Sequence, residues 1–319
     1  MKIVVLDGYA LNPGDLSWSK FEKFGQVSTY DRTVQEDQLI LNRIGKAEIV
    51  LTNKTILNKN ILEAAPKLRY VGVLATGYNV IDLKAARAKH IVVTNIPSYG
   101  TREVAQHTLA LLLEITNQVG LHDRAIKAGE WTKAKDFTFW KEPLISLLDK
   151  TMGIIGLGHI GLRVAEVAHA LGMNVIFYQH HPQETSETWL EQVSLEKLYA
   201  QADVISLHVP QNNETTQMID DAAITKMKQG VILLNTARGG LLDEEAAAAG
   251  LRSGKIGALG ADVVSNEPIH ENNPLLHAPN VYLTPHIAWA AIETRQRLMT
   301  IAVDNLAAFL KNKPKNIVS

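Results

Sequence analysis

The sequence predicts an α/β protein built on parallel β-sheets. Short β-branched or apolar runs, each long enough for one strand, alternate along the whole chain with segments of helical spacing. The runs are apolar on both faces, as is typical of strands that are buried between two layers of helices. A length of 319 residues favours about two domains. We therefore expect two doubly wound parallel-sheet domains.

The expected strands form two series along the chain. The first series comprises Ile3–Leu6, Ile49–Leu51, Tyr70–Leu74 and Ile91–Thr94. The second comprises Met152–Ile155, Val175–Tyr178, Val204–Leu207, Val231–Asn235, Ala258–Asp262 and Val281–Leu283. Apolar residues at helical spacing lie between the strands, for example in Ile56–Ala64, Asp82–Lys89 and Ile160–Leu171. Each series therefore predicts one sheet.

Two longer periodic segments, Thr101–Val119 and Ile287–Leu310, are expected to connect the domains. If both cross between domains, the middle of the chain is inserted into a domain made from its two ends. The predicted division is 1–99 and 287–319 for the outer domain, and 100–286 for the inserted one.

Composition excludes several classes of protein. Lys and Arg number 32 against 33 Asp and Glu, so charge provides no reason to expect nucleic acid or an anionic membrane surface as a partner. The absence of cysteine excludes disulfides, thiolate metal sites and a cysteine nucleophile, and favours a cytoplasmic location. No apolar run approaches the ~18 residues of a membrane span. We expect a soluble cytoplasmic protein that holds no metal.

A glycine motif, Gly156-Leu157-Gly158-His159-Ile160-Gly161, follows the expected strand Met152–Ile155 and opens a helical stretch. G-x-G-x-x-G between a strand and a helix is the dinucleotide-binding fingerprint of Rossmann domains. The first glycine permits the tight turn, the second lets a pyrophosphate approach, and the third allows close helix–strand packing. We expect the pyrophosphate to bind the backbone N–H groups of residues 157–160, at the N-terminus of the helix.

The next expected strand ends at Gln179, where the fingerprint usually has an acidic residue that binds the adenosine ribose. Glutamine can bond a hydroxyl group, but it does not repel a 2′-phosphate. No arginine stands beside it to attract one. The residue therefore favours NAD only slightly, and NADP is not excluded.

Three residues with complementary chemistry, Arg238, Glu267 and His286, each follow an expected strand, where open α/β sheets bind ligands. A planar guanidinium fits a carboxylate. Histidine can exchange a proton near neutral pH, and a carboxylate partner would raise the pKa of its imidazole. Taken singly, each residue is better explained as a surface arginine, a loop carboxylate or a structural histidine. Together they meet the needs of a 2-hydroxyacid dehydrogenase.

In their order and flanking residues, these motifs resemble those of the D-isomer-specific 2-hydroxyacid dehydrogenase family, over nearly the full length of the chain. The resemblance rests on Gly156–Gly161, His208-Val209-Pro210, Asn235–Gly239, Asp262–Pro268 and Thr284–His286. It implies a Rossmann nucleotide-binding domain inserted into a flavodoxin-like substrate-binding domain. It also implies that Arg238 binds the substrate carboxylate and carbonyl, that His286 is the acid–base and that Glu267 is its partner.

The resemblance implies further binding residues. Asp262 is expected at the nicotinamide carboxamide and Thr101 near the nicotinamide. The expected cofactor-binding residues are Thr101, Gly156, Leu157, Gly158, His159, Ile160, Gly161, Gln179, His208, Val209, Pro210, Thr215, Thr236, Ala237, Arg238, Asp262 and His286. The expected substrate-binding residues are Ala75, Thr76 and Gly77, whose backbone amides would take the carboxylate, together with Arg238, His286 and Trp289.

Ile287-Ala288-Trp289-Ala290 and Phe137-Thr138-Phe139-Trp140 are similar to segments of bacterial glycerate dehydrogenases, also called hydroxypyruvate reductases, although plain packing would explain both tryptophans equally well. This similarity implies reduction of hydroxypyruvate to D-glycerate with NAD(P)H, in a homodimer formed partly by the segment after Thr101. Glyoxylate or another 2-keto acid is the alternative substrate. A non-enzymatic NAD(H)-sensing, corepressor-like protein would share the fold and the Arg/Glu/His set. The near-neutral charge and the lack of long disordered tails favour the enzyme.

Overall fold

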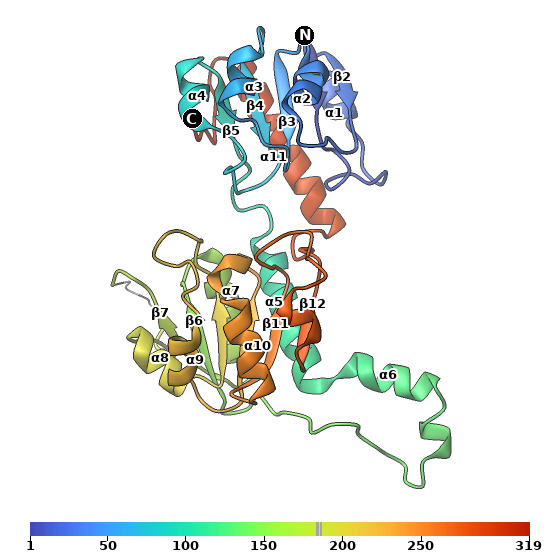
Figure 1. Cartoon of the computed structure of the whole chain (residues 1–319), viewed down its shortest axis with the longest axis vertical. Coiled ribbons are helices and arrows are strands. Elements are labelled where there is room, and N and C mark those ends of the chain that lie inside the picture. The colour runs from blue at the N-terminus through green and yellow to red at the C-terminus, as the bar shows by residue number, and fades with distance from the viewer. Residues whose placement is uncertain (183–184, 186) are drawn as a thin grey trace. The chain divides into compact units, whose positions relative to one another are not determined.

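The computed structural model describes residues 1–182, 185 and 187–319, and it divides into two compact units (Figure 1). Unit 1 comprises Met1–Tyr99 and Ala290–Ser319, and unit 2 comprises Gly100–Trp289. The second boundary follows Trp289, whereas the sequence predicts it after His286. In either division the middle of the chain forms its own unit.

Unit 1 contains a five-stranded parallel sheet with the order β2-β1-β3-β4-β5. Its strands are β1 (Lys2–Val5), β2 (Gln26–Thr29), β3 (Ile49–Thr52), β4 (Tyr70–Val73) and β5 (Val92–Thr94). Its helices are α1 (Ser19–Glu22), α2 (Asp37–Ile44), α3 (Lys59–Ala64), α4 (Leu83–Ala88) and α11 (Ile292–Leu310). This strand order is that of flavodoxin-like folds.

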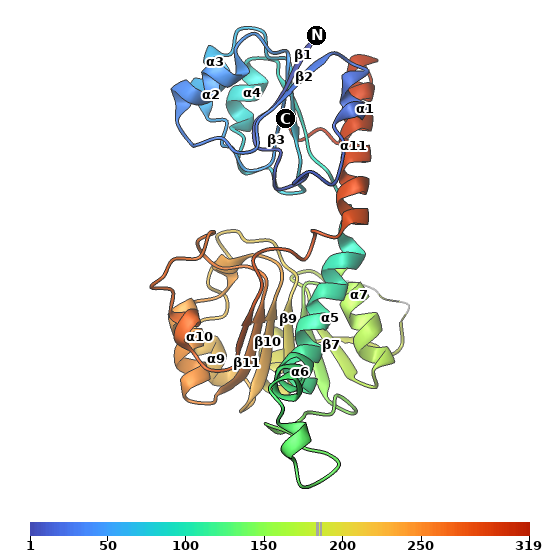
Figure 2. The same cartoon turned by 90° about the vertical axis from the view of Figure 1, so that its right-hand side faces the viewer.

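Helices cover both faces of the unit 1 sheet (Figure 2). On one face, Val50 and Val71 belong to a buried cluster with Ile40 of α2 and Ile61 of α3. On the other face the ring of Tyr70 lies 4.9 Å from that of Phe309, so the C-terminal helix packs against β4. Burial on both sides explains why these strands read as continuous apolar runs.

Unit 2 contains a seven-stranded parallel sheet with the order β12-β11-β10-β9-β6-β7-β8. Its strands are β6 (Thr151–Ile155), β7 (Asn174–Tyr178), β8 (Leu190–Gln192), β9 (Val204–Leu207), β10 (Val231–Asn235), β11 (Ile256–Ala261) and β12 (Val281–Leu283). The chain builds outward in one direction from β6 and in the other from β9. The carboxyl ends of β6 and β9 are therefore the topological switch point at which Rossmann sheets bind dinucleotides.

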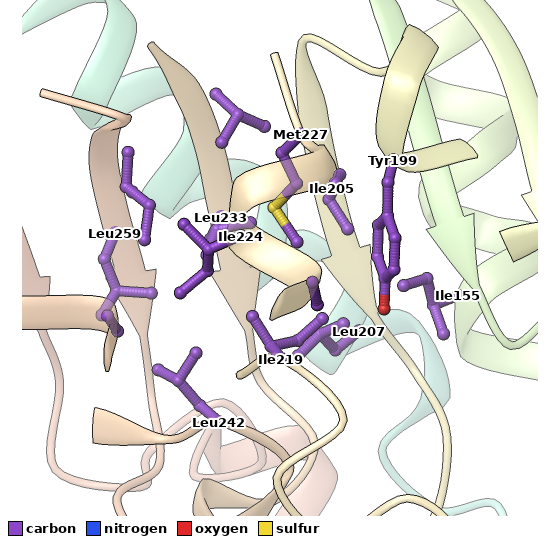
Figure 3. Close-up of a cluster of buried hydrophobic side chains, with 14 of the residues drawn as sticks. Ile155, Tyr199, Ile205, Leu207, Ile219, Ile224, Met227, Leu233, Leu242 and Leu259 are labelled. Carbon is purple, nitrogen blue, oxygen red and sulfur yellow. The ribbon is translucent and has the colours of Figure 1, made fainter. Parts of the chain in front are cut away.

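Two helical layers enclose this sheet (Figure 2). The helices of unit 2 are α5 (Thr101–Asn117), α6 (Val119–Lys127), α7 (His159–Ala170), α8 (Leu195–Gln201), α9 (Asp221–Lys226) and α10 (Glu244–Arg252), with 3-10 turns at Trp131–Lys133, Gly239–Leu241 and Pro274–His277. Figure 3 shows the layer of α8 and α9, where Ile205 and Leu233 of the sheet lie among Tyr199 and Ile224. Ile154 and Leu234, which point to the opposite face, are buried with α5 and α7. Within the described residues, no helix combines the length and apolar character needed to cross a membrane.

The fold class agrees with the prediction, but several element boundaries differ. The expected helix Thr101–Val119 ends at Asn117, because Gln118 adopts a left-handed conformation with φ of 50° and α6 starts after it. The expected helix Ile287–Leu310 begins only at Ile292. The N–H groups of Ile287 and Ala288 donate instead to the carboxylate of Asp262, which holds this segment as a loop.

Strands β2 and β8 were not predicted. Both lie at an edge of their sheet, and each carries polar residues among its few apolar ones. Edge strands are less enclosed than central strands, so their sequences lack the continuous apolar run on which the prediction depends.

Candidate active site

The glycine motif follows β6 and runs into the first turn of α7, at the switch point of the unit 2 sheet. Gly156 has φ of +95°, and a Cβ there would lie 2.8 Å from the carbonyl oxygen of His208. A Cβ on Gly161 would lie 2.2 Å from the carbonyl oxygen of Gly156. By contrast, a Cβ on Gly158 would meet no atom of the described residues within 4 Å. Gly156 and Gly161 are therefore required by the turn itself, whereas Gly158 leaves open space beside the helix N-terminus. The residues present fit a dinucleotide phosphate group.

Gln179, directly after β7, contacts this motif. Its side-chain oxygen accepts a hydrogen bond from the N–H of Leu157 at 2.9 Å. The N–H of Leu157 therefore already has a partner within the protein, although the sequence predicts it as a phosphate ligand. The helix α7 follows with Gly158 as its N-cap, and no side chain in the described part of the protein caps the first-turn N–H groups of His159 and Ile160.

The segment His208–Pro210 follows β9, on the other side of the switch point. The Nε2 atom of His208 lies 2.8 Å from Oγ of Ser206, and the backbone N–H of His208 donates to Ile155. Burial lowers the pKa of His208 to about 4. The imidazole is therefore neutral at physiological pH and acts here as a hydrogen-bonding group rather than a cation.

Two threonines among the expected cofactor ligands have structural partners. Thr215 Oγ1 donates to the carbonyl of Pro210 at 2.7 Å and closes the turn between them. Thr236 Oγ1, after β10, lies 2.7 Å from Oγ1 of Thr108 on α5. Thr101 is the first residue of α5.

Arg238 follows β10 in a turn that Asn235 holds. The Asn235 side chain donates to the carbonyl of Arg238 at 2.9 Å and accepts from the N–H of Ala237 at 3.1 Å. Gly239 packs so closely that a Cβ there would lie 1.9 Å from the carbonyl carbon of Val264. The arginine side chain is exposed and bonds the carbonyl of Ala237, which leaves other guanidinium N–H groups for an anionic ligand.

Glu267 and His286 form a hydrogen-bonded pair. Nδ1 of His286, after β12, lies 2.7 Å from Oε2 of Glu267, on the loop after β11. The two side chains are 29% and 34% exposed, respectively. Because the carboxylate accepts this bond, Nδ1 carries the proton and Nε2 is the ring atom left for a ligand. The indole N–H of Trp289 donates to the carbonyl of His286 at 2.9 Å, so the tryptophan packs against the loop that carries the histidine.

Asp262, directly after β11, is 1% exposed and holds the same loop. Oδ1 accepts from the Thr284 hydroxyl at 2.6 Å and from the N–H of Ile287 at 2.8 Å, and Oδ2 accepts from the N–H of Ala288 at 2.8 Å. On the other side of Thr284 lies His107 of α5, with its Nε2 atom 2.9 Å from Thr284 Oγ1. His107 was not predicted from the sequence, because a single histidine in an amphipathic helix has no local signature.

The loop Ala75–Gly77 follows β4 in unit 1. Thr76 Oγ1 donates to the carbonyl of Ile96 at 2.8 Å, and Asn95 donates to the carbonyl of Thr76 at 2.7 Å. The N–H of Ile96 donates to Ala75. These contacts use the oxygens of the loop, whereas the N–H groups of Thr76 and Gly77 donate to no group within the described residues. Such N–H groups suit an anionic ligand.

Comparison with known proteins identifies the family. Residues 109–288 match the protein family described as "D-isomer specific 2-hydroxyacid dehydrogenase, NAD binding domain". The chain is 50% identical to a hydroxypyruvate reductase of Blautia hydrogenotrophica, over 100% of both chains. It is 37% identical to a glycerate dehydrogenase of Methylorubrum extorquens, over 99% of this chain and 98% of the relative.

Solved structures with nicotinamide cofactors have the same fold. D-lactate dehydrogenase of Aquifex aeolicus, complexed with NAD and lactic acid, matches with a TM-score of 0.83 and 30% identity, covering 98% of this chain and 96% of that one. An acyclic imino acid reductase complexed with NADPH and D-Arg matches with a TM-score of 0.85 and 30% identity over 100% of both. The cofactor is therefore a nicotinamide dinucleotide. The match of residues 109–288, the similarity to these relatives along the whole chain and the shared fold show that the chain belongs to the D-isomer-specific 2-hydroxyacid dehydrogenase family.

Proposed function

We propose that this protein reduces hydroxypyruvate to D-glycerate with NAD(P)H. The observation that carries the proposal is the His286–Glu267 pair, with 2.7 Å between its two polar atoms, on loops at the carboxyl ends of adjacent strands of a Rossmann sheet. The choice of substrate is supported by the 50% identity to a hydroxypyruvate reductase along the whole chain.

Reduction of a 2-keto acid needs a hydride at C2 and a proton on the C2 oxygen. NAD(P)H, when bound, supplies the hydride. His286 donates the proton from Nε2 as negative charge develops on the oxygen, and it recovers a proton from solvent afterwards. Glu267 accepts the Nδ1 hydrogen and orients the ring.

Substrate recognition is assigned to groups that bind anions. The guanidinium of Arg238 pairs with the substrate carboxylate and polarises the C2 carbonyl. In unit 1, the backbone N–H groups of Thr76 and Gly77, in the Ala75–Gly77 loop, offer a second set of carboxylate donors. Trp289 is assigned to the substrate site, because its indole is fixed to the His286 carbonyl.

The cofactor is assigned to the switch point of the unit 2 sheet. The proposed ligands are the glycine motif, Gln179, His208–Pro210, Thr215, Thr236, Ala237, Asp262 and Thr101. Because Gln179 is neutral, we propose that NADH is preferred over NADPH only modestly.

We also propose a cytoplasmic homodimer with no nucleic-acid or membrane partner. The segment 119–148 extends from the body of unit 2 (Figure 1) and exposes Ile126, Trp131, Phe137 and Trp140, of which Phe137 is 88% exposed. An apolar groove of about 510 Å³ lies between α5 and α7, lined in part by Leu109, Leu113 and Val167. A second copy of the chain would cover such apolar surface. A net charge of −1 supports the absence of a nucleic-acid or membrane partner. The lack of cysteine supports the cytoplasmic location.

Initial rates on a panel of 2-keto acids, each with NADH and with NADPH, test the proposed reaction. We expect the highest kcat/KM with hydroxypyruvate, and D-glycerate as the product on chiral chromatography. His286→Asn should lower kcat roughly 10²–10⁴-fold, the range for loss of a general acid, while NADH binding persists. Faster turnover of glyoxylate than of hydroxypyruvate would move the protein to the alternative substrate. No turnover with any acid on the panel would overturn the proposal.

The proposed dimer is tested separately, by sedimentation equilibrium of the wild type and of Trp140→Glu. We expect a dimer for the wild type and a shift towards monomer for the variant, because a charge replaces an exposed apolar ring. A monomeric wild type would overturn it.

A further inference from the structure

His107 reaches the loop that carries His286 from a distant part of the sequence. The residue lies on α5, and its side chain is 21% exposed. Its Nε2 atom is 2.9 Å from Oγ1 of Thr284 and 3.5 Å from Oδ1 of Asp262. The sequence separation between His107 and Thr284 is 177 residues, so this contact exists only because α5 packs against β10 and β11.

The donor and acceptor of each hydrogen bond between His107, Thr284 and Asp262 follow from the single hydroxyl hydrogen of Thr284. A threonine hydroxyl has one hydrogen, and Thr284 donates it to Oδ1 of Asp262 at 2.6 Å. The Thr284 oxygen can therefore only accept from His107. Consequently Nε2 of His107 carries a hydrogen and acts as the donor. The sequence of donations runs from His107 to Thr284 and from Thr284 to Asp262.

Asp262, which is held by Thr284, in turn holds the loop that carries His286. Its carboxylate accepts the N–H groups of Ile287 and Ala288, the two residues that follow His286. Thr284, whose hydroxyl donates to the Asp262 carboxylate, lies two positions before His286. The backbone N–H of His286 donates to the Thr284 carbonyl at 3.0 Å. His286 itself has φ of +56°, a left-handed conformation that non-glycine residues rarely adopt. The loop is therefore held from both sides of the histidine.

We propose that His107 is a positioning residue for catalysis: its Nε2–H fixes Thr284 and Asp262, which hold the loop so that Nε2 of His286 points at the substrate oxygen. The proposal rests on the proposed acid–base role of His286. His107 does not touch the reacting atoms and exchanges no proton with the substrate. Its contribution is geometric, and small displacements of a catalytic group cost large factors in rate.

Two substitutions separate the hydrogen bond from the packing of the side chain. His107→Leu fills similar space but cannot donate, whereas His107→Gln places an amide N–H at a reach close to that of Nε2. We expect His107→Leu to lower kcat for hydroxypyruvate about tenfold or more, with KM for the keto acid changed less than about threefold. His107→Gln should recover most of this loss. His169→Leu is the matched control, because this helical histidine of unit 2 lies in the last turn of α7, where it stacks on Trp189.

A double-variant cycle tests the connection to Thr284. Thr284→Val removes the acceptor of His107 and the donor to Asp262 together. If the two residues act in one chain, His107→Leu/Thr284→Val should be about as slow as the slower single variant, rather than slower by the product of both effects. Thermal unfolding of each variant records any loss of stability, and rates are compared at a temperature where every variant is folded.

The outcomes distinguish this inference from the proposed function. An unchanged kcat in folded His107→Leu, no recovery in His107→Gln, or independent effects in the double variant would each overturn the positioning role. If His286→Asn is strongly impaired, each of these results leaves the proposed reaction and the acid–base role of His286 intact. If His286→Asn retains full activity, the proposed acid–base role fails first, and the inference about His107 fails with it.

Discussion

The side-chain oxygen of Gln179 accepts the backbone N–H of Leu157 at 2.9 Å, joining the end of β7 to the glycine motif after β6. The contact brings a neutral group, rather than a carboxylate, to the edge of the dinucleotide-binding loop. It also shows how a residue outside the motif holds the shape of the turn. Because the glutamine carries no charge, nothing at this position repels a 2′-phosphate.

Gln179→Asp should therefore sharpen the preference for NADH. A carboxylate at this position would bond the ribose hydroxyls and repel the 2′-phosphate, so kcat/KM with NADPH should fall by about tenfold, which corresponds to about 1.4 kcal/mol. Steady-state rates with both cofactors measure the ratio, and Gln179→Asn controls for the shorter side chain. A wild type that already rejects NADPH by a factor of thousands would show that another residue discriminates.

Gly158→Val should weaken cofactor binding while the fold persists. A Cβ at Gly158 would have no atom of residues 1–182, 185 or 187–319 within 4 Å, so the side chain would enter the space assigned to the pyrophosphate. We expect Kd for NADH, from fluorescence titration, to rise at least about tenfold, with little change in Tm. Gly161→Val is the contrasting variant. Its Cβ would lie 2.2 Å from a backbone oxygen, so this change should lower Tm. Unchanged NADH titration in folded Gly158→Val would falsify the assignment.

Glu267→Gln should lower kcat for hydroxypyruvate about tenfold or more. The carboxylate accepts the Nδ1 hydrogen of His286 at 2.7 Å and so fixes the orientation of the ring and of Nε2. An amide in its place makes a weaker hydrogen bond without the negative charge, so the ring is held less firmly. Steady-state rates measure kcat, and Kd for NADH, from fluorescence titration, is the control that we expect to stay near the wild-type value. A kcat equal to that of the wild type would exclude the pairing and leave His286 to act alone.

Arg238→Lys should mainly raise KM for the keto acid. Lysine keeps the positive charge but loses the planar fork that binds a carboxylate through two hydrogen bonds. We expect KM for hydroxypyruvate to rise about tenfold or more, while Kd for NADH stays near the wild-type value. If kcat falls instead and KM is unchanged, the arginine acts on the transition state alone rather than on substrate binding.

His208 should make stability depend on pH below neutrality. Burial lowers its pKa in the folded protein to about 4, against about 6.5 in an unfolded chain. Between these values the unfolded chain binds more protons, so stability falls as the pH decreases from 6.5 towards 4. The contribution between pH 7 and pH 5 is about 1–2 kcal/mol. Urea unfolding at both pH values should show a smaller difference for His208→Asn, which retains a polar side chain beside Ser206. Equal pH dependence in both proteins would contradict this origin.

The sequence by itself determined the fold class and the central strands. Val204–Leu207 and Val231–Asn235 begin and end as predicted, because strands buried on both faces must be continuously apolar. The order of the glycine motif, Arg238, Glu267 and His286 sufficed to indicate the family, since each motif is local and follows a strand. Local patterns of this kind survive in the sequence because their physical cause lies within a few neighbouring residues.

Tertiary structure alone decided which side chains meet. Helix α11 starts only at Ile292, although the helical spacing of apolar residues begins earlier. The N–H groups of Ile287 and Ala288 donate to the buried carboxylate of Asp262, so these residues do not form a helical turn. The bond between Gln179 and Leu157 and the contact between His107 and Thr284 join residues 22 and 177 positions apart. No periodicity records such pairs. The first pair meets because a parallel sheet brings the carboxyl ends of β6 and β7 to one edge, and the second because α5 packs against β10 and β11. In both places polar groups that leave the core must find partners in one another.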